Sequence, residues 1–241
     1  MDIYKSNRLT YRPIGDVKHE EFLFSLLTEP GVLNFDTSIP AGVSRADMAG
    51  VGQSMRARKL LSMYICLPPT PTLTSASASA SASSADGDGE ATPIGVVSLS
   101  RPEDRQGQHG RSFLSVAVGR RWQRRGYGRE AVAWALDWAF DFARLHRVEA
   151  SCYAWNPGAR RLYARLGFRP EGVRREAVWF MGAWHDLHEL AVLEHEWRGP
   201  GRAAAGAGTW APVAAAEGDG GGVVVGRSYS SAEIAEKMGS A

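Results

Sequence analysis

Apolar residues along this chain follow two different spacings. Short, nearly continuous apolar runs of the kind that form buried strands occur at Leu60 to Leu67, Ile94 to Leu99 and Phe113 to Val118. From Gly126 to Ala143 the apolar residues instead recur at helical spacing. This spacing places Ala131, Ala135, Trp138 and Phe142 on one face. The pattern therefore predicts both strands and helices.

The order of these elements indicates the fold class. The first third of the chain predicts a strand at Arg8 to Ile14 and helical regions at Val17 to Leu27 and Ser44 to Lys59. Three strands, a helix, a strand (Val148 to Trp155), a second helix and a closing pair of strands follow. This order predicts an α+β arrangement around a mixed sheet.

Local signals place the last helix and the closing hairpin. Asn156-Pro157 supplies a helix cap followed by proline at the first helical position, and Gly167 ends the same helix. Its inner face carries Ala159, Leu162, Tyr163 and Leu166. The runs Val173 to Met181 and Trp184 to His195 predict a hairpin that turns at Gly182-Ala183.

Two low-complexity segments interrupt this pattern. An alternating Ser-Ala tract, Ser75 to Ser84, lies within residues 68–92, and a Gly- and Ala-rich stretch begins at Gly199. Neither can bury enough apolar surface to offset the entropy lost on ordering. We therefore expect one domain at 1–198 with a disordered insertion at 68–92, and a disordered tail at 199–241.

Composition indicates the size of the core, the state of the cysteines and the cellular setting of the protein. The 241 residues are 44% hydrophobic and include eight tryptophans, enough for one well-packed core. Cys66 and Cys152 lie in apolar runs, which indicates reduced thiols rather than a disulfide or a metal site. The start of the chain shows no signal sequence, and no apolar run approaches the roughly 20 residues of a membrane span. We expect a soluble intracellular protein that uses no metal.

The segment Gln123-Arg124-Arg125-Gly126-Tyr127-Gly128 lies between a predicted strand and a predicted helix. Glycines there let a ligand approach the backbone, and the helix start offers unpaired N–H groups and the positive end of the helix dipole. The formal net charge is only +2, so the local arginines indicate a small anionic ligand rather than nucleic acid. A pyrophosphate fits such a site.

This segment resembles the acyl-CoA signature Q/R-x-x-G-x-G/A of the GNAT N-acetyltransferase superfamily. Leu162 to Phe168 resembles the "LYxKxGF" end of a family helix. Glu171 to Glu176, Gly182-x-Trp184-x-Asp186 and Glu196-Trp197 resemble the closing hairpin of its ribosomal-protein-acetylating (RimJ/RimL-like) branch. The resemblance implies a mixed, mostly antiparallel sheet with a splayed parallel strand pair flanked by helices.

The resemblance also implies acetyl-CoA as co-substrate and a set of binding residues. The backbone of Val116 to Val118 would bind the pantetheine arm, and N–H groups from Arg124 to Arg129 would bind the pyrophosphate. Asn156 would contact the cofactor or serve only as a helix cap. The implied cofactor-binding residues are Val116, Val118, Gln123, Arg124, Arg125, Gly126, Tyr127, Gly128, Arg129 and Asn156.

Tyr163 aligns with the frequent general acid of the family, although an inward-facing core aromatic would show the same spacing. The general base stays open among Glu149, Glu176, Asp186, His188 and Glu189. A protein N-terminus with a pKa near 8 needs little help to lose its proton, so the reaction could proceed without a dedicated base.

The resemblance leaves the acceptor undetermined, because a fold does not dictate a substrate. A protein N-terminus, a polyamine or another small amine such as an aminoglycoside would each suit an N-acetyltransferase, and a homodimer is compatible with the sequence. Two rival hypotheses are a non-catalytic acyl-CoA-binding protein and an RNA-binding protein that uses Arg120 to Arg129.

Overall fold

The computed structural model describes residues 2–15, 19–33, 52, 55, 59–69, 91–101 and 107–199. The helix expected at Ser44 to Lys59 and the segments 68–92 and 199–241 lie outside these residues, apart from a few flanking positions. None of the helices in the described ranges is both long and apolar enough to cross a lipid bilayer.

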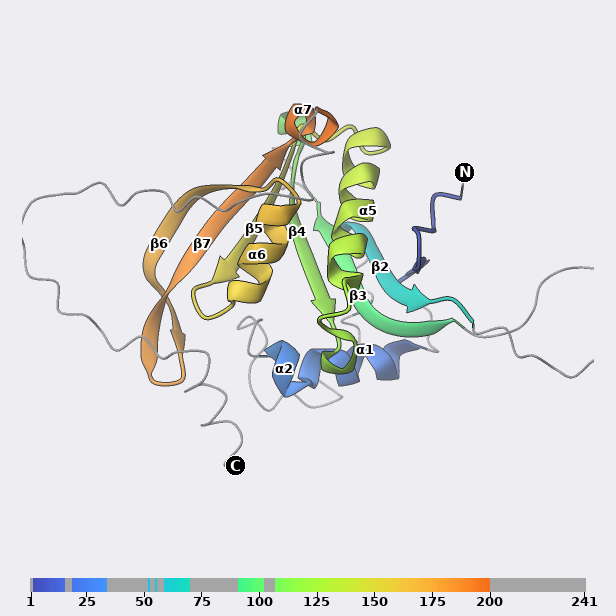
Figure 1. Cartoon of the computed structure of the whole chain (residues 1–241), viewed down its shortest axis with the longest axis horizontal. Coiled ribbons are helices and arrows are strands. Elements are labelled where there is room, and N and C mark those ends of the chain that lie inside the picture. The colour runs from blue at the N-terminus through green and yellow to red at the C-terminus, as the bar shows by residue number, and fades with distance from the viewer. Residues whose placement is uncertain are drawn as a thin grey trace, which may run out of the picture.

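Within the described ranges the strands form one mixed sheet in the order β1-β2-β3-β4-β5-β7-β6 (Figure 1). The strands are β1 (Thr10–Pro13), β2 (Lys59–Leu67), β3 (Thr92–Ser100), β4 (Arg111–Val118), β5 (Arg147–Tyr153), β6 (Arg169–Phe180) and β7 (Ala183–Leu193). All neighbouring strands pair antiparallel except β4 and β5, which are parallel. The expected α+β class with a mixed, mostly antiparallel sheet is confirmed.

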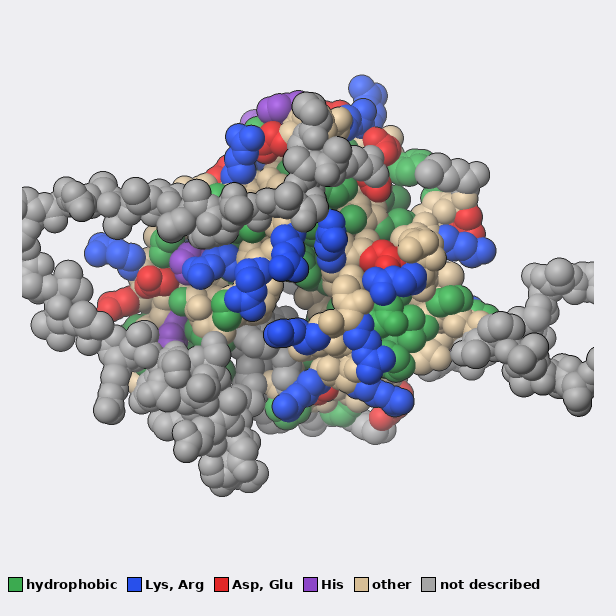
Figure 2. Space-filling view, viewed as in Figure 1, with side chains coloured by type: hydrophobic (Ala, Val, Ile, Leu, Met, Phe, Trp, Pro, Cys, Tyr) green, Lys and Arg blue, Asp and Glu red, His purple; other side chains and the backbone are tan. Residues whose placement is uncertain are grey.

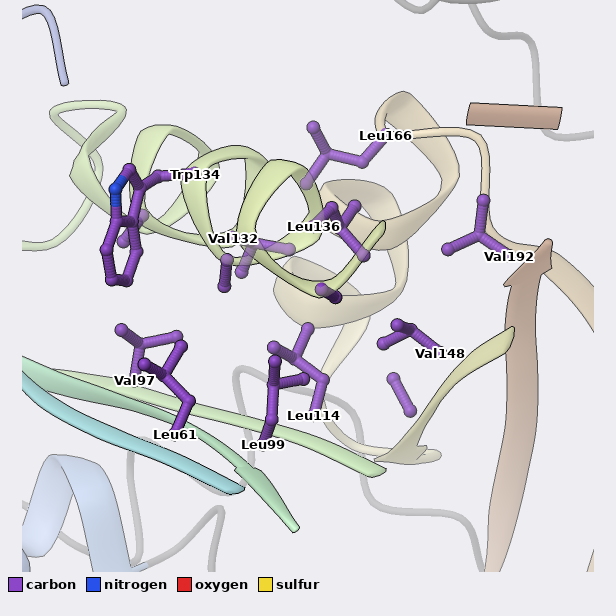
Figure 3. Close-up of a cluster of buried hydrophobic side chains, with 14 of the residues drawn as sticks. Leu61, Val97, Leu99, Leu114, Val132, Trp134, Leu136, Val148, Leu166 and Val192 are labelled. Atoms are coloured by element: carbon purple, nitrogen blue, oxygen red, sulfur yellow. The ribbon is translucent and has the colours of Figure 1, made fainter. Parts of the chain in front are cut away.

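Helices cover both faces of this sheet. They are α1 (Glu20–Thr28), α2 (Pro30–Leu33), α5 (Tyr127–Asp141), α6 (Pro157–Arg165) and α7 (Glu194–Arg198), with 3-10 turns η2 (Gly107–His109) and η3 (Arg120–Trp122). On one face, Val132 and Leu136 of α5 point toward apolar side chains of β3 and β4 (Figure 3). Leu23 and Leu26 of α1 pack on the other face. Alternating side chains of each central strand therefore enter two separate cores.

The C-terminal end of α5 departs from the expected pattern. Phe142 was expected on the buried face but is 56% exposed. The helix ends at Asp141, and Arg144 then adopts a left-handed φ of 54°. The Leu145 N–H bonds back to the Ala139 carbonyl, which turns the chain so that Leu145 fills the core instead.

The cap and stop of α6 follow the sequence signals. Asn156 Oδ1 accepts a hydrogen bond from the Ala159 N–H at 3.0 Å, and Pro157 is the first helical residue. Gly167 takes a φ of +84°, the left-handed conformation that commonly ends a helix. These residues set where α6 begins and ends.

The closing hairpin is longer at its start and shorter at its end than expected. β6 begins at Arg169, and the turn is centred on Met181 and Gly182, whose φ values are 47° and 83°. Positive φ at both positions is the type I′ pattern favoured in two-residue hairpins. His195 was expected in a strand but lies in α7, because Glu196 Oε2 accepts the Leu193 N–H and starts a helix there.

Cys66 and Cys152 are free and buried, as expected. Burial raises the pKa of each thiol to about 11, from an ordinary value of 9.0. Because the folded pKa exceeds the unfolded one, the stability that these two neutral thiols contribute is full below pH 9 and is lost as pH rises toward 11. We expect the free energy of unfolding, measured by urea denaturation, to fall across this range. A Cys66→Ala/Cys152→Ala variant should show a shallower fall, and an equally steep fall would contradict the assignment.

Candidate active site

The parallel strands β4 and β5 separate partway along their length. They pair only at Arg111 with Arg147, Ser112 with Val148 and Phe113 with Glu149. Beyond these pairs, β4 continues against β3 alone and β5 against β7 alone. Figure 1 shows the two strands diverging toward their C-terminal ends. A gap therefore opens in the middle of the sheet.

The backbone of β4 presents hydrogen-bonding groups to this gap. The Gly119 N–H donates to the Ile94 carbonyl of β3. Because backbone groups alternate in direction along a strand, those of Val116 and Val118 point the other way, toward β5. No described strand pairs with them there. An extended ligand lying in the gap could take the place of the missing strand.

The loop between β4 and α5 lies at the open end of the gap. Gly126, at the N-cap of α5, has a φ of +84°, and no described side chain caps this helix. The N–H groups of Tyr127, Gly128 and Arg129 therefore lack partners within the helix. Arg124 also has a left-handed φ of 63°. Such alternation turns successive N–H groups into a concave anion site, at the positive end of the helix dipole.

Positive side chains surround this loop. The exposed arginines are Arg120, Arg121, Arg124, Arg125 and Arg129. Figure 2 shows Lys and Arg side chains gathered around a hollow between α6 and the start of α5. The guanidinium groups of Arg121 and Arg125 lie 5.0 and 5.6 Å from the centre of the Trp122 ring, which holds both beside the loop. The arginine charges and the backbone N–H donors would suit the same anionic ligand.

Three predicted binding residues also have structural contacts. The Gln123 side-chain amide donates to the Val118 carbonyl at 2.9 Å and ties the loop to the end of β4. A Cβ at Gly128 would lie 3.3 Å from Leu162 Cδ1, so this glycine lets α5 approach α6. Asn156 Oδ1 is used by its cap, which leaves the amide NH₂ of Asn156 for a ligand.

Tyr163 of α6 is 5% exposed, and its ring lies 5.1 Å from that of Phe168. Burial, together with the nearby Cys152 thiol, raises the pKa of its phenol, so the hydroxyl stays protonated at neutral pH. If β4 and β5 stayed paired in the same register, Cys152 would lie opposite Val116. Tyr163 therefore lies near Cys152 of β5, one of the two strands that border the gap.

The expected base candidates are engaged in different ways. Glu149 Oε1 accepts from Arg147 at 2.8 Å, and Glu189 Oε1 lies 2.5 Å from an Arg174 nitrogen. Asp186 accepts the backbone N–H of Glu176 at 2.9 Å, on the outer hairpin.

His188 differs from these carboxylates in place and in charge. It pairs with Cys152 in the β5–β7 ladder, on the face covered by α6. Burial, followed by the charge of Arg160, lowers the pKa of His188, so its imidazole is neutral at physiological pH.

Two anchors of the loop have no local signal in the sequence. Both Glu29 carboxylate oxygens accept the Arg120 N–H, at 3.2 and 3.1 Å. Arg8 Nη1 donates to the Arg125 carbonyl at 3.2 Å. These partners lie 91 and 117 positions apart in the chain, so no residue spacing could indicate them.

Comparison with known proteins finds relatives that are named as N-acetyltransferases. The chain is 34% identical over 82 residues to the probable N-acetyltransferase YjcK of Bacillus subtilis, covering 34% of this chain and 45% of that protein. It is 30% identical over 109 residues to the [ribosomal protein uS5]-alanine N-acetyltransferase of Escherichia coli, covering 45% and 55%. The chain thus spans about half the length of the curated relatives it matches.

Fold comparison points the same way. The spermidine N-acetyltransferase of Vibrio cholerae, solved in complex with CoA and spermine, superposes with a TM-score of 0.63. The superposition covers 79% of this chain and 98% of that one at 17% identity, so it shows a shared fold. Residues 8–169, well over half of the chain, match the acetyltransferase (GNAT) domain family, and this protein therefore belongs to that family.

Proposed function

We propose that this protein is an N-acetyltransferase that transfers the acetyl group of acetyl-CoA to a primary amine by direct attack. The observation that carries the proposal is the parting of β4 and β5 beside an uncapped helix start. The gap offers β4 backbone groups that no described strand pairs with, and the helix start offers donors for phosphates. A single elongated, anionic thioester would occupy both the gap and the helix start.

The residues present fit this co-substrate. The N–H groups of Tyr127, Gly128 and Arg129 would hold the pyrophosphate, with the loop arginines supplying charge. The Val116 backbone and the Val118 N–H would pair with the amide-bearing arm, while the Val118 carbonyl accepts from Gln123. The thioester supplies an activated acetyl group at the level of Tyr163.

The chemistry needs a neutral amine and a proton for the departing sulfur. The amine nitrogen forms the new C–N bond, the C–S bond breaks, and the amine loses a proton to water or to a base. Tyr163, kept protonated by burial, would protonate the departing thiolate. A thiolate formed in a desolvated gap is more basic than one in water, which favours this transfer.

The charges on the open face of the hairpin support a peptide N-terminus or other monoamine as acceptor. Val148, Ala150 and Cys152 enter the core beneath α6, so Glu149 and Glu189 lie on the opposite face. Arginines already pair with both carboxylates. A polyamine would have to displace these arginines to find negative partners, whereas a single N-terminal amine would not.

A thiol-release assay with acetyl-CoA tests the function. The acceptors are peptides with free N-termini, spermidine and an aminoglycoside, with an N-terminally blocked peptide as control. We expect thiol release with a free peptide, faster than with spermidine, and an acetylated product by mass spectrometry. Binding of CoA without thiol release for any acceptor would instead indicate a non-catalytic acyl-CoA-binding protein.

Gly126→Ala should weaken CoA binding at least tenfold in calorimetric titration. A methyl group there strains the left-handed backbone and would stand 3.2 Å from Arg8 Nη2, at the place where phosphates approach. Gly182→Ala is the matched control, because Gly182 has nearly the same φ but lies in open space on the hairpin. Equal CoA affinity of the two variants would remove the proposed phosphate site.

Tyr163→Phe should lower kcat by about 100- to 10,000-fold with little change in CoA affinity, because only proton delivery is lost. Tyr64→Phe is the control: this buried hydroxyl donates to the His19 carbonyl on the other face of the sheet. Its loss should reduce the melting temperature but not kcat. Wild-type kcat in Tyr163→Phe, with chemistry shown to limit turnover, would make Tyr163 a core aromatic only.

A further inference from the structure

The N-terminal segment before β1 lies along the first half of α5. Tyr11 stacks on Trp134 with ring centres 3.6 Å apart, and the Trp134 indole N–H donates to the Ile3 carbonyl at 2.9 Å. These contacts place Arg8 beside the start of the helix. Leu9, at the end of this segment, belongs to the core with α5, on the opposite face of the sheet from α1.

Glu130, in the first turn of α5, collects the polar contacts of this segment. Its carboxylate accepts from the Arg8 N–H at 2.6 Å, from Arg8 Nε at 2.8 Å and from Ser6 Oγ at 2.8 Å. Burial raises the pKa of Glu130, but these hydrogen bonds outweigh it and hold the pKa below its usual range. The carboxylate is therefore charged and fixed at neutral pH.

The Arg8 guanidinium contacts the loop as well as Glu130. Nη1 donates to the Arg125 carbonyl at 3.2 Å, and the group lies 4.9 Å from the centre of the Tyr127 ring. A single planar side chain thus contacts the loop on both sides of Gly126. A rigid fork of this kind fixes geometry in a way that a single ammonium group does not.

The loop requires such support because of its backbone. Arg124 is a non-glycine residue in the left-handed region, a conformation that is strained for a side chain with a Cβ. Gln123 anchors the loop on one side of Arg124 through the Val118 carbonyl. Arg8 anchors it on the other side, through Arg125. Loss of either anchor lets the strained residue relax and turns the N–H groups away from a common centre.

We propose that Arg8 is a positioning residue that holds the phosphate-binding loop in its binding conformation by linking Glu130 to the Arg125 carbonyl. This inference rests on the proposed use of the loop to bind CoA. Arg8 acts on the cofactor through the loop, and the reacting atoms lie at the other end of the gap. Its loss should therefore raise KM for acetyl-CoA and leave kcat nearly unchanged.

Steady-state kinetics and calorimetric titration of Arg8→Gln and Arg8→Lys test the proposal. We expect both variants to raise KM for acetyl-CoA and the Kd of CoA by about 10- to 100-fold, with kcat within about twofold of wild type. Arg8→Lys should not rescue, because an ammonium group cannot span both partners.

The matched control is Arg169→Gln, on the outer edge of the sheet. Arg169 pairs with Glu196 at 2.8 Å, and the Glu196 side chain is 13% exposed, against 14% for Glu130. This variant should lose comparable stability without a change in KM. Equal KM changes in the Arg8 and Arg169 variants, or KM changes that track melting temperature, would overturn the proposal.

Titration with dephospho-CoA separates positioning from direct contact with the 3′-phosphate. Positioning predicts the same loss of affinity for CoA and dephospho-CoA in Arg8→Gln. A loss confined to CoA would make Arg8 a ligand of the 3′-phosphate and overturn the positioning role. If the wild-type protein binds neither compound, the proposed function itself fails, whereas unchanged affinity in Arg8→Gln rejects only the role of Arg8.

Discussion

The end of the pairing between β4 and β5 is the constraint on which this site depends. After Phe113 and Glu149 the two strands no longer bond to each other, so the β4 backbone at Val116 and Val118 faces a gap. Backbone N–H and C=O groups that lack partners away from water cost free energy, so a native sheet rarely opens without a replacement. A ligand with its own amide groups is such a replacement. Under the proposed function, CoA binding would complete the sheet at this gap.

The rest of the fold keeps this gap open and aligned with the helix start. Val132 and Leu136 fix α5 over β3 and β4, so its N-terminus stays at the end of β4 (Figure 3). On β5, the aromatic stack of Tyr153, Trp155 and Phe180 ties the end of the strand to the hairpin, with ring centres 4.6 Å apart at each step. Each strand thus has its own partner on its outer side, β3 for β4 and β7 for β5.

The sequence could predict features that depend on neighbouring residues. The glycine-arginine loop, the cap at Asn156 and the stop at Gly167 each reflect the backbone preference of one or two residues, and the structure agrees on their local geometry. The prediction that Phe142 is buried was wrong because periodicity assumes a helix that continues, whereas α5 ends at Asp141. The prediction that His195 lies in a strand was wrong because the cap formed by Glu196 at the Leu193 N–H starts a helix there.

Long-range contacts could not be predicted in this way. Arg8 and Glu130 are 122 positions apart, and nothing in the spacing of either residue marks a partner. The same holds for Glu29 and the Arg120 N–H. The predicted set therefore contains the residues that form the loop before α5 and its local anchor Gln123, and it lacks the distant residues Arg8 and Glu29 that also hold the loop. The cofactor roles of the predicted residues, and the acid role of Tyr163, stay predictions.

Residue-resolved amide hydrogen exchange with and without CoA tests the central claim most directly. If an extended arm pairs with the open edge of β4, CoA should slow exchange at Val116 and Val118. The slowing should exceed any general stabilisation seen at Ala117, whose backbone groups face β3. Bound CoA that leaves Val116 and Val118 unchanged relative to Ala117 would contradict the claim that the gap between β4 and β5 receives the cofactor.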